Sequence, residues 1–320
     1  MKELIAFSIP TGIGAKIGGY AGDCGHIARK FSEYFRLIVN PNVVNAGVLS
    51  ALNDEMLYVE GYAFDALLAG ETKLKTVRQN KIGVIFDCSI PKNILNIHIN
   101  TINAAKLVWG LDITGYEVTK EPVGVGFETK EGISTGSLNN PETLLSAANK
   151  LIEKGAQAIA VVCFFEDHDD TEYSCGEGID PIGGVEAVIS HYLTKELNIP
   201  AAHSPAFGSL DISEDIVDKK ASAEYISSTY LPCVLQGLNK APQLSDSGKI
   251  SCTHIKALVV PSGALGSKAV LGCLKNNIPV CAVKNPSQLN VTCQKLKQDG
   301  IIEFNDYDSC LNFLRKKFYG

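Results

Sequence analysis

The sequence predicts an α/β fold with two Rossmann-like lobes, mainly parallel sheets and a site in the cleft at the carboxyl ends of the strands. Short β-branched apolar runs recur along the chain with helical segments between them, which is the pattern of parallel strands joined by crossover helices. Polar turns that contain glycine follow many of these runs. Because ligands of open parallel sheets bind beyond the carboxyl ends of the strands, we expect the functional residues in these turns.

Strands are expected wherever a short apolar run occurs. In chain order these runs cover residues 4–9, 37–39, 57–59, 82–86, 158–165, 199–202, 257–260 and 278–283. One intervening helix is marked at both ends, since Asn140 suits its cap, Pro141 its first position and Gly155 its end. The apolar residues of this helix form one stripe, which predicts packing on a sheet.

A change in composition predicts the domain boundary. Residues 129–140 are rich in Gly, Ser, Thr and Asn, as linkers often are. We therefore expect an N-terminal α/β lobe of residues 1–134 and a C-terminal α/β lobe of residues 135–320. A second polar stretch, residues 240–251, is interpreted as a surface loop.

Composition argues against several classes of protein. The net charge of −6 over 320 residues does not suit a nucleic-acid or anionic-membrane surface, which needs clustered Lys and Arg. No apolar run reaches the roughly 20 residues that cross a bilayer. The ten cysteines contain no C-x-x-C pair, and the first residues lack a secretion-signal pattern. We expect a cytoplasmic protein. Its cysteines, among them Cys24, Cys88, Cys163 and Cys273, are expected to be small buried hydrophobic residues. Assembly into a homo-oligomer is compatible with the sequence.

The segment at residues 176–191 predicts half of a small-molecule site. Asp180 suits a helix N-cap and Pro181 the first helical position, which places Gly183 and Gly184 in the first turn. Backbone N–H groups there lack helical partners, and glycine lets a ligand approach the main chain. The sequence thus predicts binding of a small anionic metabolite, such as a carboxylate or phosphate, with Asp180 and Glu186 also at the substrate.

Two histidines are the acid and base candidates. His191 lies two turns after Gly184 on the same predicted helix, and His203 follows the next predicted strand. Imidazole accepts and returns protons near pH 7, so the pair suits proton transfer. The alternative for each is a core histidine that bonds a backbone carbonyl.

Two glycine turns, at residues 9–16 and 260–268, resemble each other. They add four substrate-binding candidates, namely Thr11, Gly12, Gly14 and Gly263. In the second turn, Ser262 and Lys268 are a candidate nucleophile and base, and Lys268 is alternatively an electrostatic clamp. Neither turn matches G-x-G-x-x-G or a P-loop, so no nucleotide cofactor is predicted.

Two further chemistries stay open. Residues 166–170, with Glu172 nearby, offer oxygen ligands for a hard divalent cation, although such a run is more often a solvated loop. Cys88 and Cys163, near strand ends, resemble the arrangement of two-thiol racemases. Buried core cysteines are the favoured interpretation of both.

Four segments together resemble one family, namely residues 9–23, 59–63, 77–80 and 183–191. It is an uncharacterised family of bacterial and plastid proteins, described as a domain of unknown function. The resemblance extends through residues 231–235 and 260–262, includes the segments of His191 and His203, and excludes Cys88 and Cys163. It implies no reaction. Residues 183–191 are also similar to the Gly-Gly-x-Glu-x-Val-x-Ser segment of cyanuric acid hydrolases and barbiturases, which use serine–lysine pairs in three repeats.

We expect an enzyme that acts on a carboxylate or amino-acid-like metabolite by proton transfer at carbon, as an isomerase, racemase or lyase. His203 and His191 would transfer the proton, and the glycine turns would hold the carboxylate. One alternative is an amidohydrolase that opens a cyclic amide with Ser262 and Lys268. Another is a metabolite sensor that binds in the same cleft without catalysis.

Overall fold

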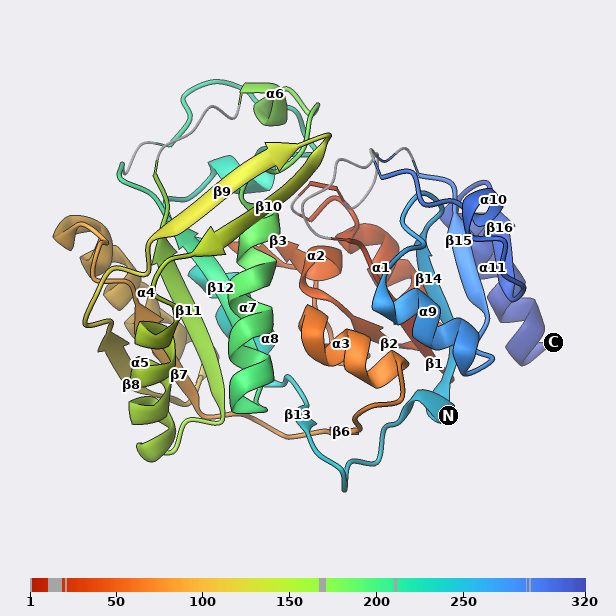
Figure 1. Cartoon of the computed structure of the whole chain (residues 1–320), viewed down its shortest axis with the longest axis horizontal. Helices are drawn as coiled ribbons and strands as arrows, with labels where there is room; N and C mark the ends of the chain where they lie inside the picture. The colour runs from red at the N-terminus through yellow and green to blue at the C-terminus, as the bar shows by residue number, and fades with distance from the viewer. Residues whose placement is uncertain are drawn as a thin grey trace.

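A computed structural model describes residues 2–10, 19–20, 22–166, 171–209, 212–285, 287 and 289–320. Two parallel sheets organise the chain (Figure 1). The larger sheet has the order β16 (Ile301–Phe304), β15 (Val280–Val283), β14 (Ile255–Pro261), β1 (Leu4–Phe7), β2 (Arg36–Val39) and β5 (Met56–Tyr58). The smaller has the order β12 (Ala201–Ala206), β11 (Ala158–Phe164), β7 (Ile82–Phe86) and β8 (Ile113–Val118). These sheets confirm the predicted α/β class with mainly parallel strands. The six-stranded sheet with its covering helices forms one lobe and the four-stranded sheet with its covering helices forms the other, so each lobe contains residues from both sides of residue 134.

Three short antiparallel pairs complete the strands of the described residues. They are β9 (Val125–Lys130) with β10 (Ile133–Leu138), β3 (Asn45–Ala46) with β4 (Leu49–Ser50), and β6 (Leu74–Lys75) with β13 (Gln243–Leu244). The chain leaves the six-stranded sheet through β6 and returns to it through β13, so these two strands lie side by side between the lobes (Figure 1). The polar stretch at residues 240–251 therefore includes a strand of the connection.

Each large sheet contains strands from both sides of residue 134. Strands β1, β2 and β5 pair in one sheet with β14 to β16, and β7 and β8 share the other with β11 and β12. Residue 134 itself lies within β10, whose hairpin with β9 packs on α7 (Gly183–Leu197). The Gly- and Ser-rich composition near residue 134 thus corresponds to this hairpin.

Helices cover both faces of the six-stranded sheet. On one face, α1 (Gly25–Ser32) and α11 (Tyr307–Tyr319) contribute Phe31, Tyr307 and Leu311 to the core. On the other, α3 (Gly61–Leu68) and α9 (Lys268–Lys275) contribute Phe64 and Val270. Burial of these side chains removes apolar surface from water, the main driving force for folding.

The four-stranded sheet is covered in the same way. Helices α5 (Pro141–Glu153) and α7 pack on one face around Leu144, Leu151 and Val185. Helices α4 (Lys92–Trp109) and α8 (Leu231–Asn239) cover the other face of this sheet. Their buried apolar residues belong to the same hydrophobic core as those of α1 and α11 on the six-stranded sheet. The helix predicted between Asn140 and Gly155 is thus confirmed as α5, with Pro141 in its first turn.

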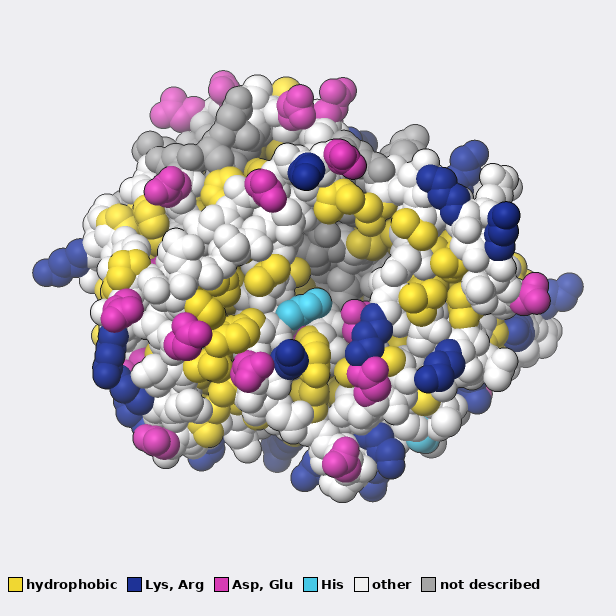
Figure 2. All heavy atoms as spheres, viewed as in Figure 1, with side chains coloured by type: hydrophobic (Ala, Val, Ile, Leu, Met, Phe, Trp, Pro, Cys, Tyr) yellow, Lys and Arg dark blue, Asp and Glu magenta, His cyan; other side chains and the backbone are white. Residues whose placement is uncertain are grey.

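The remaining helices are single turns. They are α2 (Pro41–Val44), α6 (Thr171–Ser174), α10 (Cys293–Leu296) and the 3₁₀ turns η1 (Ser222–Tyr225) and η2 (Cys252–His254). Within the part of the chain that the structure describes, no helix is long and apolar enough to span a bilayer. The face shown in Figure 2 carries charged side chains of both signs and is hollowed near its centre.

The cysteines are unpaired, and most of them are buried as predicted, including Cys24, Cys163 and Cys273. Cys88 is an exception, because it is exposed in the turn after β7. The apolar run before it predicts burial. The strand stops two residues earlier, at Phe86, so the thiol lies outside the sheet.

Candidate small-molecule site

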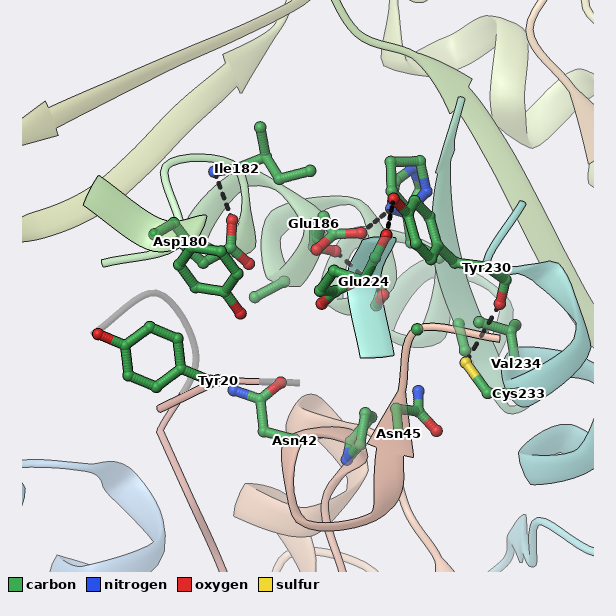
Figure 3. Close-up of a pocket in the computed structure, with 18 of the residues that line it drawn as sticks. Tyr20, Asn42, Asn45, Asp180, Ile182, Glu186, Glu224, Tyr230, Cys233 and Val234 are labelled. Atoms are coloured by element: carbon green, nitrogen blue, oxygen red, sulfur yellow. Dashed lines mark hydrogen bonds and ion pairs between the residues drawn. The ribbon is translucent and has the colours of Figure 1, made fainter. Parts of the chain in front are cut away.

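A cavity of about 430 Å³ lies between the two lobes. Strand β12, helices α7 and α8 and residues 207–209, 212–213 and 224–230 line one side of it, and α2, β3 and residues 19–20 line the other. In Figure 3, Asp180, Glu186 and Glu224 lie across the cavity from Tyr20, Asn42 and Asn45. This volume is in the range of pockets that enclose small metabolites.

Glu186 and His203 form the central pair of the cavity. Glu186 lies in the first turn of α7, and its carboxyl Oε1 is 3.0 Å from Nδ1 of His203 in β12. The His203 side chain is 1% exposed, whereas that of Glu186 is 24% exposed. The histidine is therefore packed behind the carboxyl group, and the carboxyl group is the member of the pair that faces a ligand.

Hydrogen bonds decide the protonation state of His203. The backbone N–H of Cys163 donates to its Nε2 at 3.3 Å, so Nε2 acts as an acceptor and carries no proton. The ring proton is then on Nδ1 and is donated to Glu186. Burial also lowers the pKa of His203, because desolvation disfavours the imidazolium. His203 is thus a neutral donor that orients Glu186.

Two carboxyl groups of the cavity, those of Glu186 and Glu224, have raised pKa values. Burial raises the pKa of Glu186 above its ordinary range. The pKa of Glu224 is raised well above its usual value, first by burial and then by the neighbouring charges of Asp180 and Glu186. Glu186 and Glu224 lie next to each other in Figure 3. A carboxyl group with a raised pKa is a stronger base than usual and is still ionised in part near neutral pH.

Two tyrosines close one side of the cavity. The rings of Tyr20 and Tyr173 are 4.8 Å apart between centroids, and the Tyr20 hydroxyl donates to the carbonyl of Gly178 at 3.3 Å. Lys220 Nζ lies 4.9 Å from the centroid of the Tyr20 ring and donates to the carbonyl of Gly176. These contacts join residues 19–20 of one lobe to the segments before α7 and η1 of the other.

The start of α7 differs from the prediction. The helix begins at Gly183 and its cap position is Ile182, so Asp180 is not the cap. Instead, Asp180 Oδ1 accepts the N–H of Ile182 at 3.0 Å. A short polar side chain bonds the backbone two residues on in such a turn, and this turn holds Asp180 at the cavity wall.

Gly183 and Gly184 occupy the first turn of α7 as predicted, but the described cavity wall does not include them. The N–H of Gly184 donates to Ser134 Oγ at 2.9 Å, and a Cβ at this position would lie 2.1 Å from the carbonyl oxygen of Ser134. Gly184 is thus required for the packing of α7 against β10. Its N–H already has a partner in the protein.

His191 also lines the cavity. Its Nε2 lies close to α3, where a Cβ on Gly61 would be 2.2 Å away, and burial lowers the pKa of its ring. The structure thus brings His191, His203 and Glu186 to one cavity, as the sequence predicted. His203 lies inside β12 and does not follow it, because the strand runs to Ala206.

Ser262 and Lys268 lie elsewhere. Ser262 follows β14 and lines a separate hollow of about 360 Å³ with Lys284 and Glu303. Lys268 begins α9, where its Nζ is 2.5 Å from Glu71 Oε2 in an exposed ion pair. That contact raises the pKa of Lys268, so the ammonium form is favoured over a free base.

Gly263 is a packing residue in the same turn. A Cβ there would lie 2.6 Å from the carbonyl oxygen of Leu289, and its own carbonyl accepts the N–H of Val291. The three candidates of the first glycine turn, Thr11, Gly12 and Gly14, lie outside the described residues. The same holds for residues 167–170 of the candidate metal loop. Across the residues that are described, no group of three or more His, Cys, Asp or Glu side chains forms a metal site.

The two-thiol arrangement finds no support in the geometry. Cys163 is buried in β11, and burial raises the pKa of its thiol well above the usual range. Cys88 is exposed, and neither residue belongs to the described cavity wall. Thiolates are the reactive form of cysteine, and because burial raises the pKa of the Cys163 thiol far above neutral pH, this thiol stays protonated and is not available as a base.

Sequence reasoning missed several cavity residues. Glu224 lies in the 3₁₀ turn η1, Tyr58 ends β5, Tyr230 directly precedes α8 and Cys233 lies in the first turn of α8. The Tyr230 hydroxyl donates to the backbone carbonyl of Glu224 at 2.8 Å and so fixes the turn that carries this carboxyl group. The one available signal was the clustering of tyrosines in an otherwise polar segment, residues 222–230.

Comparisons with known proteins identify a family and a relative, and neither description names a reaction. The model of the family described as "Protein of unknown function (DUF3326)" matches residues 5–316. A protein of Synechococcus sp., named as an uncharacterized lipoprotein, is 37% identical over 295 residues, which cover 88% of this chain and 82% of that protein. No solved structure matches the chain significantly. The cytoplasmic location remains a prediction.

Proposed function

Because the chain belongs to this family of proteins of unknown function, we propose its function from the cavity: it is an enzyme that moves a proton at a carbon atom of a small metabolite. The single observation that carries the proposal is the Glu186 carboxyl group, which faces the cavity and is held from behind by neutral His203. Racemases, and the isomerases and lyases that break a C–H bond, need a side-chain base at the substrate.

In the proposed step, a C–H bond of the substrate breaks and its proton goes to Glu186. The electron pair stays on the substrate as a carbanion or enolate. Return of the proton to another carbon completes an isomerisation, and loss of a leaving group completes an elimination. Burial raises the pKa of Glu186, which makes its carboxylate a better base and its acid form available near neutral pH.

The roles of the two histidines follow from their contacts. Both ring nitrogens of His203 contact the protein, so His203 is a positioning residue for Glu186. His191 lines the cavity near Glu186 on the same helix and is the second candidate for proton transfer. The amidohydrolase alternative lacks comparable support, because Lys268 pairs with Glu71.

Deuterium uptake by a panel of compounds tests this proposal and does not require an identified substrate. The full chain is incubated in D₂O with amino acids, other amines, sugars and carboxylates, and stable C–D bonds are detected by mass spectrometry. We expect uptake by one class of compound and a loss of about 100-fold or more in Glu186→Gln. Glu128→Gln, an exposed acid in β9, should behave as the wild type.

Two results would contradict the proposal. Equal uptake in wild type and Glu186→Gln would remove Glu186 from the reaction. Compounds that bind and stabilise the protein but gain no deuterium would indicate the sensor alternative.

A further inference from the structure

We infer that His191 donates a hydrogen bond to the carbonyl oxygen of a ketone or an aldehyde, beside the carbon from which Glu186 takes the proton. This inference rests on the proposed function, because it assigns a substrate class and a further catalytic residue to the same cavity. Binding of a ketone at His191 nevertheless holds or fails separately from the proton transfer.

The imidazole of His191 differs in its contacts from that of His203, the other histidine of the described cavity wall. Both ring nitrogens of His203 have partners in the protein. Among the described residues, neither ring nitrogen of His191 has one. A neutral imidazole carries one N–H donor and one acceptor, and a ligand that covers the ring has to supply their partners. His191 therefore offers an N–H group to a ligand of the cavity.

The surroundings of His191 keep its ring neutral. Burial lowers the pKa of this histidine, because desolvation disfavours the imidazolium. Its Nε2 also lies so close to Gly61, the first residue of α3, that a Cβ there would be 2.2 Å away. The start of a helix carries partial positive charge, which further disfavours a cation. His191 is thus better suited to hold an oxygen with its N–H group than to take up the proton itself.

Glu186 and His191 face the cavity from the same side of α7. The described wall includes Glu186, Ala187, Ser190 and His191, and residues four apart on a helix are neighbours on its surface. Five residues separate Glu186 from His191, which is about 7.5 Å along the helix axis. This separation leaves room for a C–H and C=O unit between the carboxyl group and the ring, with about 3 Å to each of them.

A ketone or an aldehyde matches both residues chemically. When Glu186 takes the proton from the carbon next to C=O, the electron pair of the broken C–H bond forms a C=C bond, and the π electrons of C=O move to the oxygen. The N–H of His191 stabilises this oxygen without transferring its own proton. A carboxylate would bring a second negative charge beside the Glu186 anion, and like charges at short distance repel. The neutral carbonyl compound is therefore favoured.

Matched compounds test the substrate class. They are dihydroxyacetone against glycerol, hydroxyacetone against 1,2-propanediol, and fructose against sorbitol, with glycerate and lactate as carboxylates that lack a ketone. Binding to the full chain is measured by titration calorimetry. Deuterium uptake in D₂O is measured by mass spectrometry, and uptake in protein-free buffer is subtracted.

Three variants test the role of His191. His191→Ala removes the ring, and His191→Gln keeps a neutral N–H donor. His26→Ala is the matched control, because His26 is an exposed histidine of α1. A urea unfolding curve for each variant shows that it is folded before its binding is interpreted.

We expect at least one ketone of the panel to bind at least 10-fold more tightly than its alcohol partner and to gain deuterium. His191→Ala should weaken that binding at least 10-fold and slow the uptake by about 100-fold, as loss of a donor to a developing oxyanion does. His191→Gln should recover part of both, and His26→Ala should match the wild type. Nitrogen NMR of His191, assigned with His191→Gln, should show a neutral ring at pH 7.

Several results would overturn the inference. They are a panel without a ketone preference, tighter binding of the carboxylates, ketone binding undiminished in His191→Ala, a His191→Gln variant as impaired as His191→Ala, and an imidazolium at His191 at pH 7.

Two outcomes separate this inference from the proposed function. Ketone binding that depends on His191, without deuterium uptake in the wild type, leaves the carbonyl site intact and refutes proton transfer. Uptake that is lost in Glu186→Gln but is confined to compounds without a ketone or an aldehyde group leaves the proposed function intact and refutes the carbonyl site.

Discussion

His98 and His203 are both buried histidines of the same lobe, yet only His203 belongs to the cavity. His98, in α4, pairs its Nδ1 with Thr229 Oγ1 at 2.9 Å, and its ring lies 5.9 Å from the Phe86 ring between centroids. Its Nε2 has no hydrogen-bond partner. His203 has partners on both nitrogens, and one of them is a carboxyl group that opens on the cavity. Burial alone therefore does not identify a functional histidine. The identity of its hydrogen-bond partner, and whether that partner faces the cavity, distinguish His203 from His98.

The largest expected effect is a loss of activity when His203 is replaced, with no comparable loss when His98 is replaced. His203→Leu removes the donor to Glu186, and we expect deuterium uptake to fall by about 100-fold, as loss of an orienting residue often does. Without this donor the Glu186 carboxylate is less stabilised, so its pKa rises and the pH profile of uptake moves to higher pH.

His203→Gln, which keeps an N–H donor, should recover part of the uptake, and His98→Leu should retain most of it. A merely structural role of His203 would change the amount of folded protein but leave the pH profile in place. An unchanged profile in His203→Leu would therefore contradict the positioning role.

A second comparison sets Glu186 against Glu60, a buried carboxyl group outside the described cavity wall. Burial raises the pKa of Glu60 to about 8. Below pH 4.5 both folded and unfolded chains keep this proton, and between pH 4.5 and 8 only the folded chain keeps it. The stability contribution of Glu60 is thus complete at low pH and is lost as the pH rises through 8.

Glu60→Gln removes this titration and keeps an oxygen that accepts the N–H of Ala63. We expect the fall in unfolding free energy between pH 5 and pH 8 to shrink by a few kcal/mol, on the order set by linkage. Urea unfolding at the two pH values measures it. An equal fall in both proteins would show that Glu60 does not carry a raised pKa.

The structural role of His98 predicts a smaller effect, on stability alone. His98→Leu removes the ring partner of the buried Thr229 hydroxyl, which then keeps only the N–H of Leu231, and we expect a loss of about 2 kcal/mol in unfolding free energy. Deuterium uptake per folded molecule should stay within about threefold of the wild type. A loss of uptake as large as that of His203→Leu would place both histidines in the catalytic arrangement.

The smallest effect concerns the contact between the lobes at the cavity. Gly61→Ala introduces a Cβ 2.2 Å from His191 Nε2, so the ring has to shift, and overpacking of this kind costs about 1 kcal/mol or more. Gly126→Ala is the matched control, because its Cβ would meet only Ser137 Oγ at 3.4 Å. Thermal unfolding of the two variants compares them, and equal melting temperatures would contradict the described packing of α3 on α7.

The sequence predicts the central strands of the sheets better than the strands at their edges. Each predicted run overlaps a strand, because buried parallel strands are continuous apolar segments. Strand β8 and the hairpin of β9 and β10 were missed. These strands have partly exposed faces and alternate polar with apolar residues, so no continuous apolar run marks them.

The site was predictable where it lies on one helix and its neighbouring strand. Glu186, His191 and His203 were identified because α7 and β12 are adjacent in sequence and in space. Glu224 was not, since the 3₁₀ turn that carries it has no periodic pattern. Ser262 and Lys268 are six residues apart in sequence, but Lys268 instead meets Glu71, whose position only the packing of α3 on α9 determines.

Titration of the Glu186 carboxyl group by carbon NMR, assigned with Glu186→Gln, tests most directly whether this pair is arranged for proton transfer. We predict a midpoint above the ordinary value of 4.5, since burial raises this pKa, and no proton uptake by His203 over the same range because Nε2 accepts the N–H of Cys163. A Glu186 midpoint at or below 4.5, or an imidazolium at His203, would contradict that arrangement.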